Sequence, residues 1–207
     1  MKPLPETLLD QAGLWRARHG NRRMSTIATG YPELDAHLPG GGWPLGALTE
    51  LIVDRYGIGE LRLFLPALCG LSHKSDRWLM WVAPPHEPYA PALAAAGLDL
   101  SRHLVARPDQ RRDILWAAEH GLRSGCCAAV LLWTEYLSGR EARRLQLAAE
   151  SSKAWALVFR PPAALGDHSP AALRLKIGVD HGERRLHVLK TRGGHPTVLN
   201  GLQWLIH

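Results

Sequence analysis

The fold of this chain is decided by CAAVLLW at residues 127–133, GREARRLQLAAESS at 139–152 and AWALVFRP at 154–161. The first and third segments are continuous apolar runs of strand length, whereas the middle segment repeats its apolar residues at helical spacing. Strands that are apolar along their whole length are typical of a parallel sheet covered by helices on both faces. This stretch therefore predicts an α/β protein with a parallel sheet.

The same alternation extends outward from this stretch. Upstream, we expect strands at 48–53, 77–83 and 103–108 and helices at 60–71, 88–98 and 110–125. Downstream, PPAALGDHSP (161–170) is expected to be a loop. Two alternating strands, at 172–180 and 184–191, then flank a short turn, which predicts an antiparallel hairpin that extends the sheet. The glycine- and proline-rich PGGGWPLG (39–46) is expected to be a turn and not a strand.

The two ends of the chain differ from this core. Residues 4–18 predict an amphipathic helix, whose apolar face comprises Leu4, Leu8, Leu9, Ala12 and Trp15. We expect Leu8, Leu9 and Trp15 to be buried where this helix docks, either on its own body or on a neighbouring subunit. We therefore divide the chain into an N-terminal helical arm with its linker (1–24), a core domain (25–192) and a C-terminal tail (193–207).

Composition excludes several classes of protein. With 46% hydrophobic and 21% charged residues, the chain is typical of a globular protein and not of a disordered one. Its longest apolar runs are far shorter than the ~20 residues that span a bilayer, and the opening MKPLPETLLDQAG lacks the apolar core of a secretory signal. Three cysteines, two of them adjacent, make neither a disulfide framework nor a zinc site. We expect a cytoplasmic protein with no membrane partner and no metal.

The segment DRYGIGEL (54–61) follows the strand at 48–53, where a nucleotide-binding α/β protein carries its phosphate loop, GxxxxGK[ST]. The positions of this vestigial loop are filled by Asp54, Gly57, Gly59, Glu60 and Leu61. Glu60 stands where the motif has lysine, and a carboxylate repels the phosphates that a lysine would attract. A carboxylate is instead favoured at a helix N-terminus. The sequence therefore predicts a cap in place of a nucleotide site, with no cofactor.

Two further positions lack catalytic chemistry. Pro84 and Pro85 occupy the tip of the strand at 77–83, and Glu87 beyond them fits a solvated loop residue better than a catalytic base. The strand at 127–133 ends on Trp133, where a nucleotide hydrolase needs an aspartate on the Mg²⁺ side. We therefore expect no catalytic residues and no enzymatic activity.

The order of these segments resembles a RecA-like three-layer fold. The lead-in STIATGYPELDAHLPGGGWPLGALTELIV (25–53) precedes the degraded loop, and PGGGWP together with APPHEPYAPA (83–92) resembles the ImuA family. Members of that family are translesion DNA synthesis-associated proteins of bacteria, and the cell-division inhibitor SulA is a shorter relative of them. The resemblance covers residues 25–192.

The resemblance implies a non-catalytic accessory protein of SOS-induced translesion synthesis. Its partners would be an ImuB-type inactive polymerase subunit and, indirectly, an error-prone C-family DNA polymerase, with RecA as a further candidate. The segments that correspond to the DNA loops of RecA, near 134–140 and 162–170, are short, so any DNA contact is expected to be weak or indirect. Two alternatives stay open: a SulA-type inhibitor that binds the tubulin-like division protein, and a divergent RecA-like ATPase. A homo-oligomer also stays open.

The C-terminal part of the chain is the expected partner surface. Residues 171–207 carry six basic side chains against two acidic ones, a surplus that steers acidic partners. We expect the hairpin to form a sheet edge that can accept a partner strand. The candidate partner-binding residues are Arg184, Arg185, Lys190, Arg192, Leu202, Trp204 and Leu205. For the apolar tail, a last strand that buries Trp204 and an anchor on the polymerase-like subunit are both open.

Overall fold

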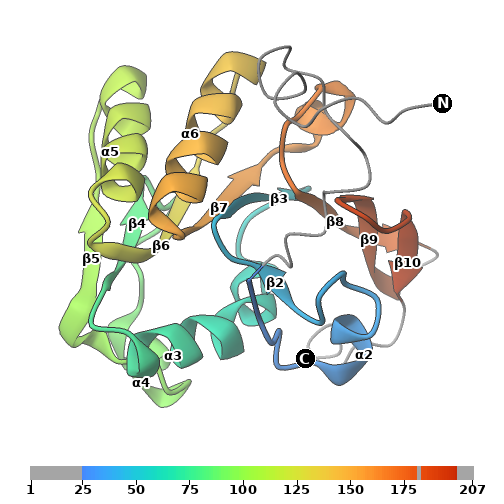
Figure 1. Cartoon of the computed structure of the whole chain (residues 1–207), viewed down its shortest axis with the longest axis horizontal. Helices are drawn as coiled ribbons and strands as arrows, with labels where there is room; N and C mark the ends of the chain where they lie inside the picture. Colours follow the sequence, from blue (N-terminus) through green and yellow to red (C-terminus); the bar gives the residue numbers. More distant parts are fainter. Residues whose placement is uncertain (1–24, 181–182, 200–207) are drawn as a thin grey trace, which may run out of the picture.

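A computed structural model describes residues 25–180 and 183–199, and their central feature is an eight-stranded sheet (Figure 1). In spatial order its strands are β10 (Thr197–Leu199), β9 (Glu183–Thr191), β8 (Leu173–Asp180), β3 (Ala47–Val53), β7 (Trp155–Arg160), β6 (Cys127–Trp133), β4 (Trp78–Val82) and β5 (His103–Ala106). The run from β8 to β5 is parallel, and β9 and β10 are antiparallel to their neighbours. The expected mostly parallel sheet with an antiparallel C-terminal extension is confirmed.

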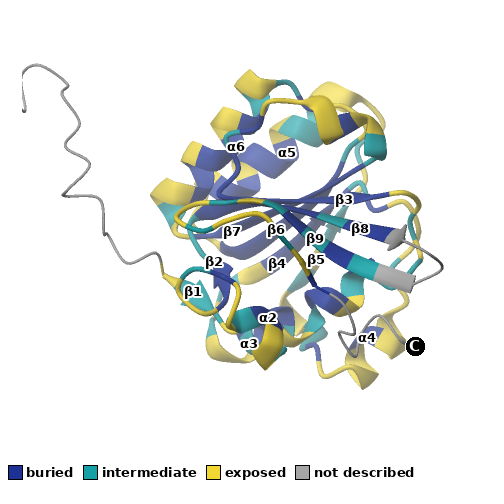
Figure 2. Cartoon of the chain, turned by 90° about the vertical axis from the view of Figure 1, so that its right-hand side faces the viewer, coloured by how far each residue is buried: buried dark blue, intermediate teal, exposed yellow. Residues whose placement is uncertain are grey.

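Helices cover both faces of this sheet (Figures 1 and 2). One face carries α5 (Arg111–Arg123), α6 (Gly139–Ser152) and the 3₁₀ helix η4 (Pro162–Gly166). The other carries α3 (Leu65–Lys74) and α4 (Ala90–Ala95), together with α2 (Pro32–Asp35) and the 3₁₀ helices η2 (Glu60–Leu63) and η3 (Leu100–Arg102). Among the described helices, none combines the length and apolar character needed to cross a bilayer.

Four of the eight tryptophans of the chain lie in the core. Trp43, Trp81, Trp133 and Trp155 are buried on the α3 face of the sheet, in one apolar cluster. Trp133 lies parallel to Phe159, with 4.5 Å between ring centroids. A second cluster fills the space under α5 and α6 and consists mainly of alanine, valine and leucine. The aromatic layer therefore holds α3 on the sheet, and smaller side chains let α5 and α6 approach it closely.

Two local expectations were wrong. The turn at 39–46 contains strand β2 (Trp43–Pro44), which pairs with β1 (Thr26–Ile27). This pairing needs a glycine, because a Cβ on Gly42 would lie 2.2 Å from the carbonyl oxygen of Ile27. The helix expected over 60–71 is divided into η2 and α3, since Pro66 lies in the first turn of α3 and has no N–H to continue a helix from the preceding turn.

The end of the sheet also differs from expectation. The hairpin strand β9 is not an outer strand, because β10 pairs with its residues Leu186–Val188. The sheet therefore continues beyond Arg192, and its outermost strand on this side is the short β10. The expected N-terminal helix lies outside the described residues, as do Leu202, Trp204 and Leu205 of the tail.

Candidate functional site

The vestigial phosphate loop is closed by its own glutamate. Glu60 is 5% exposed, and its carboxylate accepts hydrogen bonds from the backbone N–H of Gly57 at 3.0 and 3.1 Å and from that of Ile58 at 3.0 Å. Gly59 allows this geometry with a φ of 94° in the left-handed region. The carboxylate therefore accepts hydrogen bonds from N–H groups of the loop itself. The sequence analysis had predicted that it caps the following helix.

The surroundings of this loop are acidic. Burial raises the pKa of Tyr56, and the negative charges of Glu135 and Glu60 raise it further. Glu135 comes from the segment after β6, so the carboxyl ends of β3 and β6 both contribute negative charge here. An α/β nucleotide site presents a lysine and a metal at this edge, whereas here the edge carries Glu60 and Glu135 together with the exposed Arg55.

Trp133 and Glu87 stand at the other two positions where a nucleotide hydrolase would carry catalytic residues. Trp133, at the end of β6, is part of the core. The side chain of Glu87 is 78% exposed and pairs with Arg107 at 2.8 Å, as expected for a solvated loop residue. Within residues 25–180 and 183–199, no group of three or more histidine, cysteine or acidic side chains has metal-binding geometry.

The hairpin places Arg185 and Lys190 on one face. Leu186 and Val188 point into the core, so Arg185 and His187 lie on the opposite face, the one that carries α6 and η4. The register shifts after Val188, and this bulge returns Lys190 to the same face, opposite Arg174. We call this surface the basic hairpin face.

The other predicted partner residues are placed only in part. Arg192 is exposed and follows directly after β9. Arg184 lies in β9 opposite Val179, but its side chain is outside the description. The structure therefore places Arg185 and Lys190 on the same face, at different positions along β9, and Arg192 just beyond the end of their strand.

A buried ion pair below the basic hairpin face was missed by the sequence analysis. Glu50, in the middle of β3, is completely buried, and its carboxylate accepts hydrogen bonds from Arg174 Nε at 2.9 Å and from the Ser169 hydroxyl at 2.6 Å. Arg174 was counted among the basic surface residues, but it is only 8% exposed. The available signal was Glu50 itself, a charge within the apolar run LTELIV.

This pair fixes the segment 162–170 against the sheet. Arg174 donates from its Nη atoms to the carbonyl oxygens of Ala164 at 2.7 Å and Asp167 at 3.1 Å. Lys190 Nζ donates to the carbonyl oxygen of Ser169 at 2.7 Å. Partial burial lowers the pKa of Lys190, and the nearby charge of Arg174 lowers it further. Hydrogen bonds from Arg174 of β8 and Lys190 of β9 thus hold this segment against the sheet.

Comparison with known proteins places the fold in a family. A family model described as "Cell division inhibitor SulA" matches residues 46–156, which is more than half of the chain. The chain belongs to the SulA family. The matched region of this SulA-family chain begins just before β3 and ends within β7, so the basic hairpin face lies outside it.

Curated relatives carry two different names. "Cell division inhibitor SulA" of Yersinia enterocolitica is 32% identical over 116 residues, covering 56% of this SulA-family chain and 68% of the relative. "Protein ImuA" of Caulobacter vibrioides is 25% identical over 195 residues, covering 82% of this chain and 80% of the relative. The resemblance to the ImuA family, with SulA as a shorter relative, is confirmed. Among solved structures, SulA from Pseudomonas aeruginosa is 30% identical and covers 55% of this chain and 97% of its own, with a TM-score of 0.47.

Proposed function

We propose that this SulA-family chain is a non-catalytic, RecA-like accessory protein of SOS-induced translesion DNA synthesis. In this role it bridges an ImuB-type inactive polymerase subunit and an error-prone C-family polymerase. The observation that carries the proposal is the extent of the matches. The ImuA relative covers 82% of the chain, whereas two SulA relatives cover 56% and 61%.

The non-catalytic part of the proposal is supported by Glu60. A phosphate loop binds anions through free backbone N–H groups and a lysine. Here the chain's own carboxylate accepts those N–H groups, and it stands in the lysine position. A nucleotide would have to displace a buried carboxylate and then face its charge.

Two measurements test this part. We expect no ATP turnover above background, and no saturable binding of a labelled ATP analogue with Mg²⁺ at millimolar concentration. Turnover that disappears in a Glu60→Gln variant but persists in a matched Glu87→Gln variant would overturn the proposal and favour the divergent ATPase.

The bridging part assigns the basic hairpin face to the polymerase-like partner. Arg185, Lys190 and the adjacent Arg192 concentrate positive charge beside the outer end of the sheet. Charges of this kind raise association rates with an acidic partner, and their effect decreases as salt screens them.

A pull-down with the ImuB-type partner tests the assignment. We expect the double variant Arg185→Glu/Arg192→Glu to weaken capture at least tenfold at low salt, with a smaller difference at high salt. The matched control is Arg140→Glu/Arg143→Glu, which reverses two exposed arginines of α6. Equal losses in the two double variants would contradict the assignment.

A second candidate function is favoured by the family match itself. The SulA family model covers β3 to the start of β7, so a cell-division inhibitor that binds the tubulin-like division protein is supported by the same residues. Overexpression in a bacterial host separates the two. Filamentous cells with division blocked would support the inhibitor, and normal division together with restored damage-induced mutagenesis in a strain lacking the gene would support the accessory protein.

A further inference from the structure

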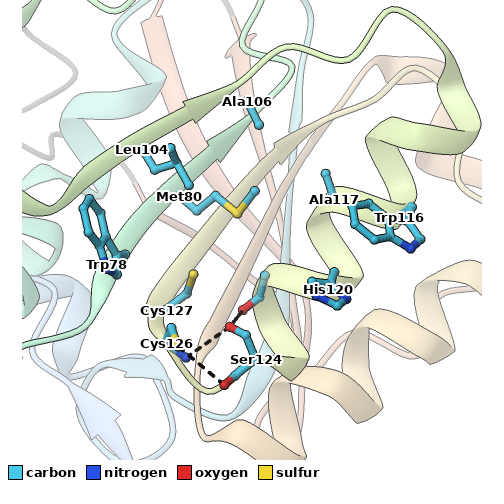
Figure 3. A pocket seen from close by; sticks show the side chains of 11 residues that line it. Trp78, Met80, Leu104, Ala106, Trp116, Ala117, His120, Ser124, Cys126 and Cys127 are labelled. Atoms are coloured by element: carbon cyan, nitrogen blue, oxygen red, sulfur yellow. Dashed lines mark hydrogen bonds between the residues drawn. The ribbon is translucent and has the colours of Figure 1, made fainter.

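An apolar groove lies between helix α5 and strands β4 and β5, at the opposite end of the sheet from the hairpin (Figure 3). Its volume is about 530 Å³. It is lined mainly by Trp78, Met80, Leu104, Ala106, Trp116 and Cys126. Trp78, Leu104 and Trp116 are 41%, 45% and 62% exposed, respectively. Large apolar side chains that gather on a surface in this way are typical of a docking site.

The groove lies where a third helix would pack beside α5 on this face of the sheet. On this face α6 and α5 pack side by side, with α5 over β4 and β6, so Leu104 of β5 is left 45% exposed. Packed helices lie about 8–10 Å apart, which equals about two strand spacings. A helix placed next to α5 would therefore lie over β5 and cover the exposed part of the groove.

We propose that residues 4–15 of the same chain dock in this groove as an amphipathic helix. Such a helix is about 18 Å long, and it would run along β5, whose four residues span about 13 Å. Its apolar face comprises Leu4, Leu8, Leu9, Ala12 and Trp15. A helix of this length is marginal alone in water, so it gains stability from the surface that covers this face.

The chain enters the described structure at the edge where the groove opens. The carbonyl oxygen of Ser25 accepts the N–H of Leu45 at 2.8 Å, just before the amino end of β3. Trp78 and Cys126 lie at the amino ends of β4 and β6, on the same edge of the parallel sheet. From β3 to β4 is three strand spacings, or about 15 Å, and residues 16–24 can span about 30 Å.

This short reach favours docking within one chain. A linker of nine residues would hold the segment near the groove at an effective concentration of about millimolar, well above the micromolar concentration of a second copy. In the proposed docking, Trp15 lies near Trp78 and Cys126, because residues 16–24 must lead back to Ser25 at the edge formed by the amino ends of the strands. Leu8 is then about 10 Å farther along, beside Leu104.

The native cysteine at this end provides a direct test. Cys126 is exposed in the groove, whereas Cys127 is buried. Under mild oxidation, the full-length Trp15→Cys variant should form an intrachain disulfide to Cys126, identified by mass spectrometry of its peptides. The rate should be at least tenfold higher than in an Arg16→Cys control, whose side chain is turned about 100° around the helix. The rate should not depend on protein concentration.

Three outcomes would overturn the proposal: equal rates in the two variants, no disulfide to Cys126, or a disulfide-linked dimer as the main product. A Leu104→Asp substitution added to Trp15→Cys gives an independent check. It should reduce the rate at least tenfold while the far-ultraviolet circular dichroism spectrum stays unchanged. An undiminished rate in that folded variant would also refute docking in this groove.

Discussion

Replacing Arg174 should destabilise the protein more than any exposed charge substitution, because it leaves a buried carboxylate without its cation. Glu50 is completely buried, and after an Arg174→Met change it would keep only the hydrogen bond from Ser169. Removing one partner of a buried pair costs about 3–5 kcal/mol. The carbonyl oxygen of Ala164, in a buried residue, would lose its donor as well. We therefore expect a loss near the upper end of that range.

The assay is urea unfolding followed by circular dichroism, together with a thermal melt. For a chain of this length, about 2–4 °C of melting temperature corresponds to each kcal/mol, so the melting temperature should fall by about 8–20 °C. An Arg143→Met control removes an exposed arginine of α6 and should change stability by less than about 0.5 kcal/mol.

A double variant isolates the cause. Glu50→Leu/Arg174→Met removes both charges and leaves apolar side chains in their place, which buried ion pairs often tolerate well. It should recover at least half of the loss seen in Arg174→Met. If the double variant is no more stable than the single one, the unpaired charge of Glu50 is not the cause and the reasoning is refuted.

Three further predictions concern the loop, an edge strand and a helix start. A Glu60→Ala change removes three hydrogen bonds to the loop N–H groups, so amide exchange at Gly57 should increase at least tenfold, and unchanged protection would contradict the closed loop. Burial lowers the pKa of His103 below its ordinary 6.5, so the unfolded chain binds a proton more readily and stability falls as pH drops below about 6.5. Urea midpoints at about pH 7.5 and 5.5 should therefore differ less in His103→Phe, and equal differences would exclude this contribution. Ser138 and Glu141 form a reciprocal cap at the start of α6, and Ser138→Ala should cost about 1 kcal/mol in the same urea assay, whereas no loss would mean that water replaces the cap.

The parts of the fold that the sequence predicted well carry their signals locally. Strand β6 and helix α6 were predicted with their observed bounds, because a continuous apolar run marks the strand and apolar residues at helical spacing mark the helix. Strands β2 and β10 are two and three residues long; β2 was not predicted, and for β10 a last strand in the tail was one of two open alternatives without stated bounds. Their pairing depends on the close approach of other segments, at Gly42 for β2, which no local pattern encodes.

The sequence predicted the candidate site only at the loop 54–61, because a known motif, the phosphate loop, is available for comparison there. The loop at 54–61 could be compared with a phosphate loop, so the role of Glu60 as an internal hydrogen-bond acceptor was partly anticipated, although its donors were not. Glu50 and Arg174 are far apart in the sequence. In β8, Arg174 and Lys176 stand at alternate positions, and this pattern does not indicate that Arg174 is buried. Burial of a charge is decided by which strand lies beside it.

Strand β3 connects these two features and explains why the proposed function needs no phosphate chemistry. Its middle carries Glu50, neutralised by Arg174 from β8, and the loop after it carries Glu60, which accepts the loop's own N–H groups. Both carboxylates thus accept hydrogen bonds from the chain itself. The basic residues of the hairpin lie beyond the region that the SulA family model covers, whereas Arg140 and Arg143 of α6 are exposed within it. The positive charge of the hairpin is compatible with the proposed partner, which would present an acidic surface.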